Sequence, residues 1–210
     1  MLTPATIVSI VLATYNRRHL LSRAIDSVLN QSTMNWELLI VDDGSEDNTE
    51  EFLKNVFMLN QKIRYFKRPH KGLAASRNFG IKNSVGKYIT FLDSDDEFRK
   101  DHLELRLKYF EDNSNIDLIH GGVELAGSEE THYVKDKFDM TKLIHLSECV
   151  IGATLFGRRK VFELLNGFND VYSEDSEFIE RATELFNIRK VDFSTYIYHT
   201  DSPDGICNTI

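Results

Sequence analysis

KYITFLDSDDE, residues 87–97, places an apolar run directly before a cluster of mostly acidic residues. Three other segments change in the same way where an apolar strand pattern stops: IVSIVLATYN (7–16), WELLIVDDGS (36–45) and IRYFKRPHKG (63–72). Open α/β sheets bind their ligands outside the carboxyl ends of parallel strands. We therefore expect these polar ends to line one crevice, and the function to lie there.

The pattern along the chain predicts an α/β fold. Strand patterns alternate with helical ones as far as Leu118, an order typical of βαβ units and a parallel sheet. Apolar spacing predicts a helix over 20–29, one from Asn48, one over 72–84, one over about 101–110 and a last one carrying residues 178–186. Strands are expected over 118–125, 153–157, 188–191 and 194–199, in a less regular second half.

Composition limits the class of protein. A chain of 210 residues fits one domain, and a net charge of −8 argues against nucleic-acid binding, which needs a basic face. The apolar run 7–13 is too short to span a membrane, so a soluble protein is expected. Cys149 and Cys207 lie far apart without a metal-ligand pattern, which favours a reduced, cytoplasmic setting.

The acidic cluster after residue 92 carries the strongest chemical signal. Asp93 and Asp95 stand one residue apart at a strand end, where both carboxylates can turn toward one hard cation such as Mg²⁺ or Mn²⁺. A solvated turn that caps the next helix is the alternative. An EF-hand is excluded because Phe98 stands where that loop needs glycine.

Two further strand ends offer groups for a nucleotide. Asp42 and Asp43 can accept hydrogen bonds from a base or ribose, or cap the next helix. Tyr15 offers an aromatic face, although such a residue is more often part of a core. No GxGxxG fingerprint, phosphate-binding loop or GxSxG elbow occurs, which argues against a dinucleotide cofactor and a serine hydrolase.

Five motifs in order resemble those of the family 2 glycosyltransferases. They are ATYN (13–16), VDDGS (41–45), GLAASRNFGI (72–81), FLDSDD (91–96), and GFND (167–170) followed by SEDSE (173–177) and Arg181. The resemblance spans nearly the whole chain. It implies the GT-A fold, a Rossmann-like, mixed and mostly parallel central sheet with helices on both faces. It also implies a single domain, 1–210, with a nucleotide-sugar half (1–98) and an acceptor and catalytic-base half (99–210).

The resemblance assigns roles to residues at the strand ends. Ala13 and Tyr15 should line a uracil pocket, Asp43 should accept the N–H of the base, and Asp93 should lie near the ribose. The full set expected to bind the nucleotide sugar is Ala13, Thr14, Tyr15, Asp42, Asp43, Lys71, Arg77, Asp93, Ser94 and Asp95. Asp95, with Asp93 and His199, is expected to hold Mn²⁺ or Mg²⁺ against the diphosphate; a structural role is the alternative for His199.

The implied reaction is a single displacement at the anomeric carbon with inversion. The resemblance places the base that accepts the acceptor's proton at Asp175, with Glu174 beside it to orient or contact the acceptor. A helix cap ahead of Phe178 is the alternative for this pair. The residues after the pair, Ser176, Glu177 and Phe178, depart from the family pattern.

The expected function is therefore transfer of a sugar from a nucleotide-diphosphate donor, with a UDP-sugar preferred, to a glycan or lipid-linked acceptor in surface glycan synthesis. Peripheral association with the inner face of a membrane is left open, as is the oligomeric state. Two alternatives remain: a nucleotide-sugar-binding relative without activity, and a sugar nucleotidyltransferase, whose Gly-rich basic signature the segment ATYNRRHL (13–20) lacks.

Overall fold

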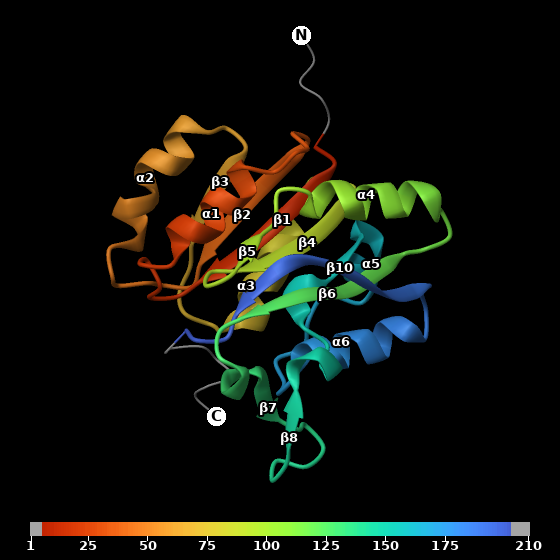
Figure 1. Ribbon diagram of the computed structural model, residues 1–210. Helices are drawn as coiled ribbons and strands as arrows, with labels where there is room; N and C mark the ends of the chain where they lie inside the picture. Colours follow the sequence, from red (N-terminus) through yellow and green to blue (C-terminus); the bar gives the residue numbers. More distant parts are fainter. Residues whose placement is uncertain (1–5, 203–210) are drawn as a thin grey trace.

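The computed structural model describes residues 6–202, and within them a curled, mixed sheet forms the centre of the molecule (Figure 1). Its strand order is β3-β2-β1-β4-β9-β6-β10-β5. The bounds are β1 Val8–Thr14, β2 Trp36–Asp42, β3 Ile63–Lys67, β4 Tyr88–Asp93, β5 Glu97–Phe98, β6 Leu118–Ala126, β9 Phe156–Arg158 and β10 Ile188–His199. The first four are parallel neighbours, β9 runs antiparallel between β4 and β6, β10 is parallel to β6, and β5 closes the sheet antiparallel to β10.

Helices cover both faces of this sheet. They are α1 Leu21–Leu29, α2 Thr49–Leu59, α3 Leu73–Asn83, α4 His102–Asp112, α5 Arg159–Leu164 and α6 Glu174–Thr183. One core cluster joins α1, α2 and α4 to the sheet, and a second joins α3, α5 and α6 to it. The expected fold class, a mixed and mostly parallel sheet between helices, is confirmed.

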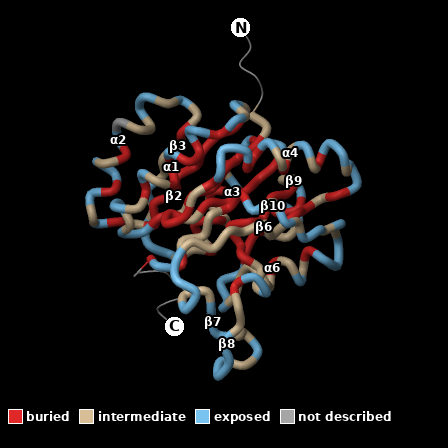
Figure 2. The backbone as a smooth tube through the Cα atoms, in the orientation of Figure 1, coloured by how far each residue is buried: buried red, intermediate tan, exposed pale blue. Residues whose placement is uncertain are grey.

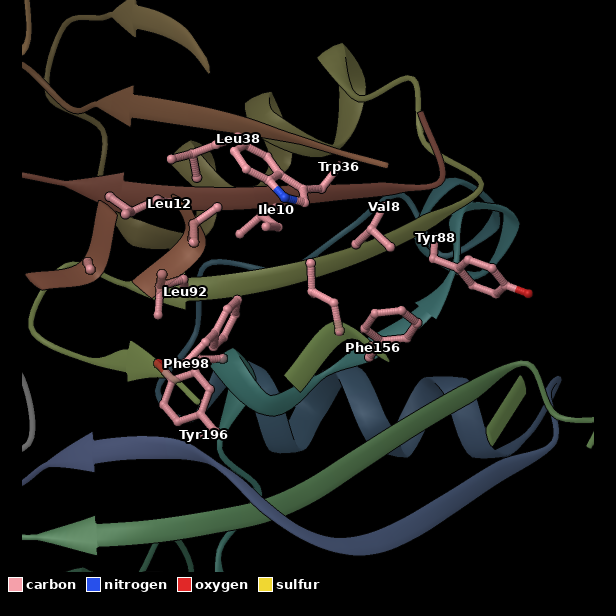
Figure 3. Close-up of a cluster of buried hydrophobic side chains, with 14 of the residues drawn as sticks. Val8, Ile10, Leu12, Trp36, Leu38, Tyr88, Leu92, Phe98, Phe156 and Tyr196 are labelled. Carbon is pink, nitrogen blue, oxygen red and sulfur yellow. The ribbon is translucent and has the colours of Figure 1, made fainter. Parts of the chain in front are cut away.

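Alternating side chains on the strands explain the two clusters. On β1, Val8, Ile10 and Leu12 enter the first cluster, and Val11 enters the second. Figure 3 shows the first cluster continuing from β1 and β2 to Phe98 and Tyr196. Because these central strands are covered on both sides, they read as near-continuous apolar runs in the sequence. Figure 2 shows the buried backbone following these strands.

A small hairpin projects from the edge of the molecule (Figures 1 and 2). It consists of β7 Tyr133–Lys135 and β8 Leu143–His145, which pair with each other and form a separate sheet. Short 3₁₀ turns flank it at Glu129–His132, Leu146–Glu148 and Gly152–Thr154. The sequence did not predict this hairpin, because the segment lacks the alternating apolar pattern of a buried strand.

Several expected boundaries in the second half are wrong. Residues 153–157 form the end of a 3₁₀ turn and only part of β9, and α6 ends at Thr183, before Leu185 and Phe186. The two strands expected over 188–199 are one strand, β10, whose pairing with β6 shifts between Val191 and Tyr196. This irregularity interrupts the alternation of side chains along the strand, so the sequence pattern predicts two strands where there is one.

Two further expectations concern single residues. Asp101 precedes α4 without a capping hydrogen bond from its side chain, and Glu104 accepts a hydrogen bond from Ser32. Cys207 lies outside the described residues. Across residues 6–202 we find no helix with the length and apolar character that crossing a bilayer requires.

Candidate active site

The carboxyl ends of β1, β2, β3 and β4 meet at one edge of the sheet. Register places Ala13 beside both Val41 and Asp93, so the residues that follow these strands come together although they are distant in sequence. A cleft of about 1150 Å³ opens at this edge and extends toward α6 and the β7–β8 hairpin. The expected crevice is thus present.

One end of the cleft presents an aromatic ring next to a carboxylate. The rings of Tyr15 and His70 are stacked, with centroids 4.1 Å apart. Asp43 is almost fully buried and accepts hydrogen bonds from the backbone N–H groups of Lys71 (3.0 Å) and Gly72 (2.7 Å). Nδ1 of His70 lies 2.8 Å from the same carboxylate. Backbone donors therefore hold Asp43 in place.

Two of the expected nucleotide-binding residues are not among those lining the cleft: Asp42 and Lys71. The carboxylate of Asp42 is fully buried and accepts from the N–H of Ser45 (2.8 Å) and the hydroxyl of Tyr65 (2.6 Å). It therefore organises the turn after β2. Lys71 contributes its backbone N–H to Asp43, whereas its side chain is not part of the lining.

The acidic turn after β4 lies in the middle of the cleft. Asp93, Ser94 and Asp95 all line it. The carboxylate of Asp95 lies 2.9 Å from the guanidinium of Arg17, and that of Asp93 lies 2.9 Å from the guanidinium of Arg77. Each carboxylate of this turn that faces the cleft is thus accompanied by an arginine.

The fourth residue of this turn, Asp96, is buried behind it. Its carboxylate accepts from the hydroxyl of Tyr196 (2.6 Å) and from the N–H of His199 (2.8 Å), both on β10. Burial, together with the nearby charges of Asp93 and Asp95, raises the pKa of Asp96 well above its usual value. Asp96 therefore joins the acidic turn to the end of β10.

His199 lines the cleft, and its Nε2 lies 2.9 Å from the carboxylate of Glu97. Its ring is thus oriented by the residue that begins β5. An imidazole held by a carboxylate is a common arrangement in metal sites, but it is also common as a purely structural contact.

The other wall of the cleft is formed by the start of α6. Arg77 is buried and bridges Asp93 on β4 and Glu174 on α6, with both N–O distances 2.9 Å. Burial opposes the charge of Arg77, but the surrounding carboxylates outweigh it and raise its pKa. Burial also raises the pKa of Glu174, although Arg77 acts in the opposite direction.

Asp175 lies beside this bridge. It accepts hydrogen bonds from the N–H of Gly152 (3.0 Å), the N–H of Ser176 (2.7 Å) and the hydroxyl of Ser173 (3.2 Å). A carboxylate has about four acceptor positions, so these donors fix its orientation without exhausting them. Both Glu174 and Asp175 line the cleft, in contact with the half that carries Asp93.

The donor set suits a divalent cation that is shared with a ligand. Within the described residues no group of three or more His, Cys, Asp or Glu side chains is arranged to hold a metal alone. Mg²⁺ in phosphate-transfer sites is usually bound by one or two carboxylates together with substrate phosphates. Asp95 and Asp93, adjacent in the cleft, fit that arrangement.

The end of the cleft formed by the hairpin and α6 carries a group of apolar side chains among charged ones, and it was not predicted from the sequence. Its lining includes Val134, Phe138, Ile144, Val171, Tyr172 and Ile179. They come from the hairpin and from the start of α6 with the loop before it. Phe138 is 83% exposed, and Tyr172 donates a hydrogen bond to the backbone carbonyl of Lys135. Apolar and charged side chains, the latter including Lys137 and Glu180, therefore lie together at this end of the cleft.

The structure thus brings together most of the expected site residues. Those that line the cleft are Ala13, Thr14, Tyr15, Asp43, Arg77, Asp93, Ser94, Asp95, Glu174, Asp175 and His199. Sequence reasoning missed Arg17, His70 and Gly152, which also line it. Arg17 and His70 lie inside the quoted strand-end segments or directly after them, which was the available signal. Nothing in the sequence pointed to Gly152.

Comparison with known proteins identifies the family. The model of "Glycosyl transferase family 2" matches residues 9–166. An uncharacterized glycosyltransferase of Rickettsia felis is 50% identical over 111 residues, 53% of this chain and 18% of that protein. An uncharacterized glycosyltransferase of Haemophilus influenzae is 33% identical over 177 residues, 82% of this chain and 70% of that protein.

A further relative has a named activity. The Escherichia coli protein WfgD, a UDP-Glc:alpha-D-GlcNAc-diphosphoundecaprenol beta-1,3-glucosyltransferase, is 35% identical over 150 residues, 70% of this chain and 57% of that protein. The chain spans less than a fifth of the length of the Rickettsia felis relative and just over half of WfgD.

Solved structures share the fold. Staphylococcus aureus TarS 1-349 in complex with UDP-GlcNAc superimposes with a TM-score of 0.73 at 17% identity, over 92% of this chain and 58% of that one. The mannosyltransferase PcManGT of Pyrobaculum calidifontis, in complex with GDP-Man and Mn²⁺, gives 0.73 at 16% identity, over 93% and 57%. The architecture is the GT-A fold, and the chain belongs to glycosyltransferase family 2.

Proposed function

We propose that the chain is an inverting, metal-dependent glycosyltransferase of cell-surface glycan synthesis that uses a nucleotide-diphosphate sugar, with UDP-sugar as the expected donor. The observation that carries the proposal is the cleft itself. It joins Tyr15 and Asp43, the acidic turn at Asp95, and the carboxylates of α6 in one continuous space. The family to which the chain belongs and its similarity to WfgD support this role.

The donor occupies the strand-end part of the cleft. The base stacks on Tyr15 and donates its N–H to Asp43, Asp93 lies near the ribose, and the diphosphate lies near Asp95 and the start of α3. Gly72, Leu73 and Ser76, at the first turns of α3, line the cleft there. A helix amino terminus favours a phosphate through its free N–H groups. Residues 1–98 thus form the donor half.

A divalent cation, Mn²⁺ or Mg²⁺, is held by Asp95, with Asp93 beside it and His199 as a further candidate ligand. When bound, the ion offsets the charge of the diphosphate and stabilises it as a leaving group. Two features support this assignment. The cleft is lined by several carboxylates that would repel a dianion. PcManGT was solved with both GDP-Man and Mn²⁺.

Asp175 acts as the base. The backbone N–H groups of Gly152 and Ser176 orient its carboxylate. The neighbouring Glu174 is paired with Arg77, which links the start of α6 to the donor half. Asp175 accepts the proton of the acceptor hydroxyl as that oxygen attacks the anomeric carbon from the face opposite the diphosphate. Glu174, held by Arg77, orients the acceptor.

The acceptor enters from the end formed by the hairpin and α6. That end, lined by Phe138, Val171 and Tyr172, suits a sugar carried on a lipid. The name of WfgD specifies such an acceptor, a GlcNAc linked through a diphosphate to undecaprenol. Residues 99–210 thus form the acceptor and catalytic half.

The test separates donor binding from transfer. We expect UDP-sugars to bind in calorimetry with Mn²⁺ present, and Asp95→Ala to remove the effect of the metal. Asp175→Asn should leave donor affinity within about twofold while lowering transfer about 10²- to 10⁴-fold, the range of a general base. Binding that ignores both Mn²⁺ and Asp95→Ala would refute the metal assignment. Unaltered turnover in Asp175→Asn would refute the base.

A further inference from the structure

His70 contacts both groups that the proposed base site offers. Its ring stacks on Tyr15 with an interplanar angle of 21° and a centroid separation of 4.1 Å. Its Nδ1 lies 2.8 Å from Oδ2 of Asp43 and donates a hydrogen bond to the backbone carbonyl oxygen of the same residue, at 3.2 Å. A flat heterocycle with a ring N–H therefore already occupies the face of Tyr15 and one acceptor position of Asp43.

A nucleobase and His70 cannot share that space. A base placed between the two rings needs about 7 Å between them, twice the contact distance of carbon atoms, and the centroids are 4.1 Å apart. A base that reached Asp43 on this side of Tyr15 would also compete with Nδ1 of His70 for the carboxylate. The imidazole of His70 must therefore move away before a base can bind there.

His70 is the member of the cluster that can move. Its side chain is 56% exposed, whereas that of Asp43 is 4% exposed. Asp43 keeps its two backbone donors, Lys71 and Gly72, whether or not His70 is present. The acceptor therefore stays in position when the imidazole leaves, and the imidazole can leave into solvent.

We infer that His70 is an intramolecular competitor of the nucleobase: it fills the base site in the ligand-free protein and swings out when the donor binds. This inference rests on the nucleotide site under Proposed function. Part of the binding free energy is spent on displacing the side chain, so the apparent affinity is lower than that of the vacated site.

The same geometry specifies the class of base. A base that takes the place of the imidazole presents a ring nitrogen to Asp43, and in uracil and guanine this nitrogen carries a hydrogen that it can donate. Cytosine and adenine present an unprotonated ring nitrogen there, and its lone pair would face a carboxylate. We therefore expect UDP and GDP to bind more tightly than CDP and ADP.

The test uses calorimetry with UDP and Mn²⁺ on the full chain. His70→Ala should bind UDP about three- to tenfold more tightly than wild type, the range expected from losing one aromatic contact and one hydrogen bond. His70→Phe keeps the stacked ring without the donor and should fall between the two. His19→Ala, on an exposed histidine that does not line the cleft, is the matched control and should equal wild type.

A second measurement asks whether the vacated place accepts a heterocycle. Millimolar imidazole should weaken UDP binding to His70→Ala and leave wild type unaffected. The inference is overturned if His70→Ala binds UDP no more tightly than wild type. If Tyr15→Ala and Asp43→Asn then both bind UDP more weakly than wild type, the proposed function remains intact. Absence of binding of all four nucleotides to wild type and to every variant overturns both.

Discussion

The two halves of the molecule hold their carboxylates in different ways. In the first half, Asp43 follows β2 and Asp93 ends β4, and the parallel register of both strands with β1 brings the two residues to the same edge of the sheet. In the second half, Glu174 and Asp175 start a helix, and their positions depend on Arg77 and on the backbone of Gly152. A site assembled by sheet register tolerates loss of a single contact better than one assembled by a few polar bonds.

Arg77 is where the two arrangements meet, because it bridges a carboxylate of each half while nearly fully buried. Arg77→Met should have the largest effect. It leaves two partly buried carboxylates without their cation, which costs about 3–5 kcal/mol of unfolding free energy. Urea denaturation followed by circular dichroism measures the loss.

Arg99→Met is the control for this change. Its ion pair with Glu124 is well exposed and screened by solvent, so the loss should be much smaller than in Arg77→Met. Equal losses in the two variants would show that the bridge between the halves has no special weight. A triple change, Arg77→Met with Asp93→Asn and Glu174→Gln, should recover part of the stability because no buried charge is left unpaired.

Asp96 provides a pH-dependent test of the junction between the acidic turn and β10. Its pKa is raised in the folded protein, so the folded state retains a proton that the unfolded state releases. Its contribution to stability is therefore full below about pH 4 and is lost as the pH rises through the folded pKa. Asp96→Asn cannot titrate, so the stability of this variant relative to wild type should increase as the pH rises above about 4.

Tyr196→Phe sharpens that test. It keeps the carboxyl group and removes a donor that lowers its pKa, so the decline of stability should continue to a higher pH than in wild type. Urea midpoints at several pH values give both curves. A pH-independent difference between Asp96→Asn and wild type would contradict the shifted titration.

The smallest expected effect on stability is at the hairpin. Phe138 is 83% exposed, so Phe138→Ser should change the unfolding free energy by no more than about 0.5 kcal/mol. Because Phe138 lines the end of the cleft formed by the hairpin and α6, the same change should raise the KM for a lipid-linked acceptor severalfold and leave donor affinity unchanged.

Leu59→Ser, on the similarly exposed end of α2, is the matched control, since Leu59 does not line the cleft. It should alter neither stability nor either kinetic constant. If Phe138→Ser and Leu59→Ser behave alike in steady-state assays with a polyprenyl-linked sugar, the acceptor does not enter over the hairpin.

The contrast between the halves also explains what the sequence could predict. The parallel strands and their crossover helices repeat with clear periods, so the order of elements up to β4 and the meeting of Tyr15, Asp43 and Asp95 in one cleft follow from pattern and topology. The irregular pairing of β10, the two-residue strand β5 and the hairpin leave no comparable period.

Single residues show the same limit. Asp42 and Asp43 are adjacent and chemically identical. Consecutive side chains at a strand end point to opposite sides, so Asp42 bonds to Tyr65 whereas Asp43 lines the cleft. His70 was within a quoted segment, but its contact with Tyr15 depends on the path of the loop before α3. Such three-dimensional contacts carry no local signature.

The bonds of Asp96 to Tyr196 and His199 span 100 and 103 residues of sequence. During synthesis the ribosome releases the acidic turn long before it releases those partners. A nascent chain that ends before β10 therefore lacks both donors to Asp96, at the turn that carries Asp93 and Asp95. Nucleotide recognition should consequently appear late in translation, once the last strand has emerged from the exit tunnel and docked.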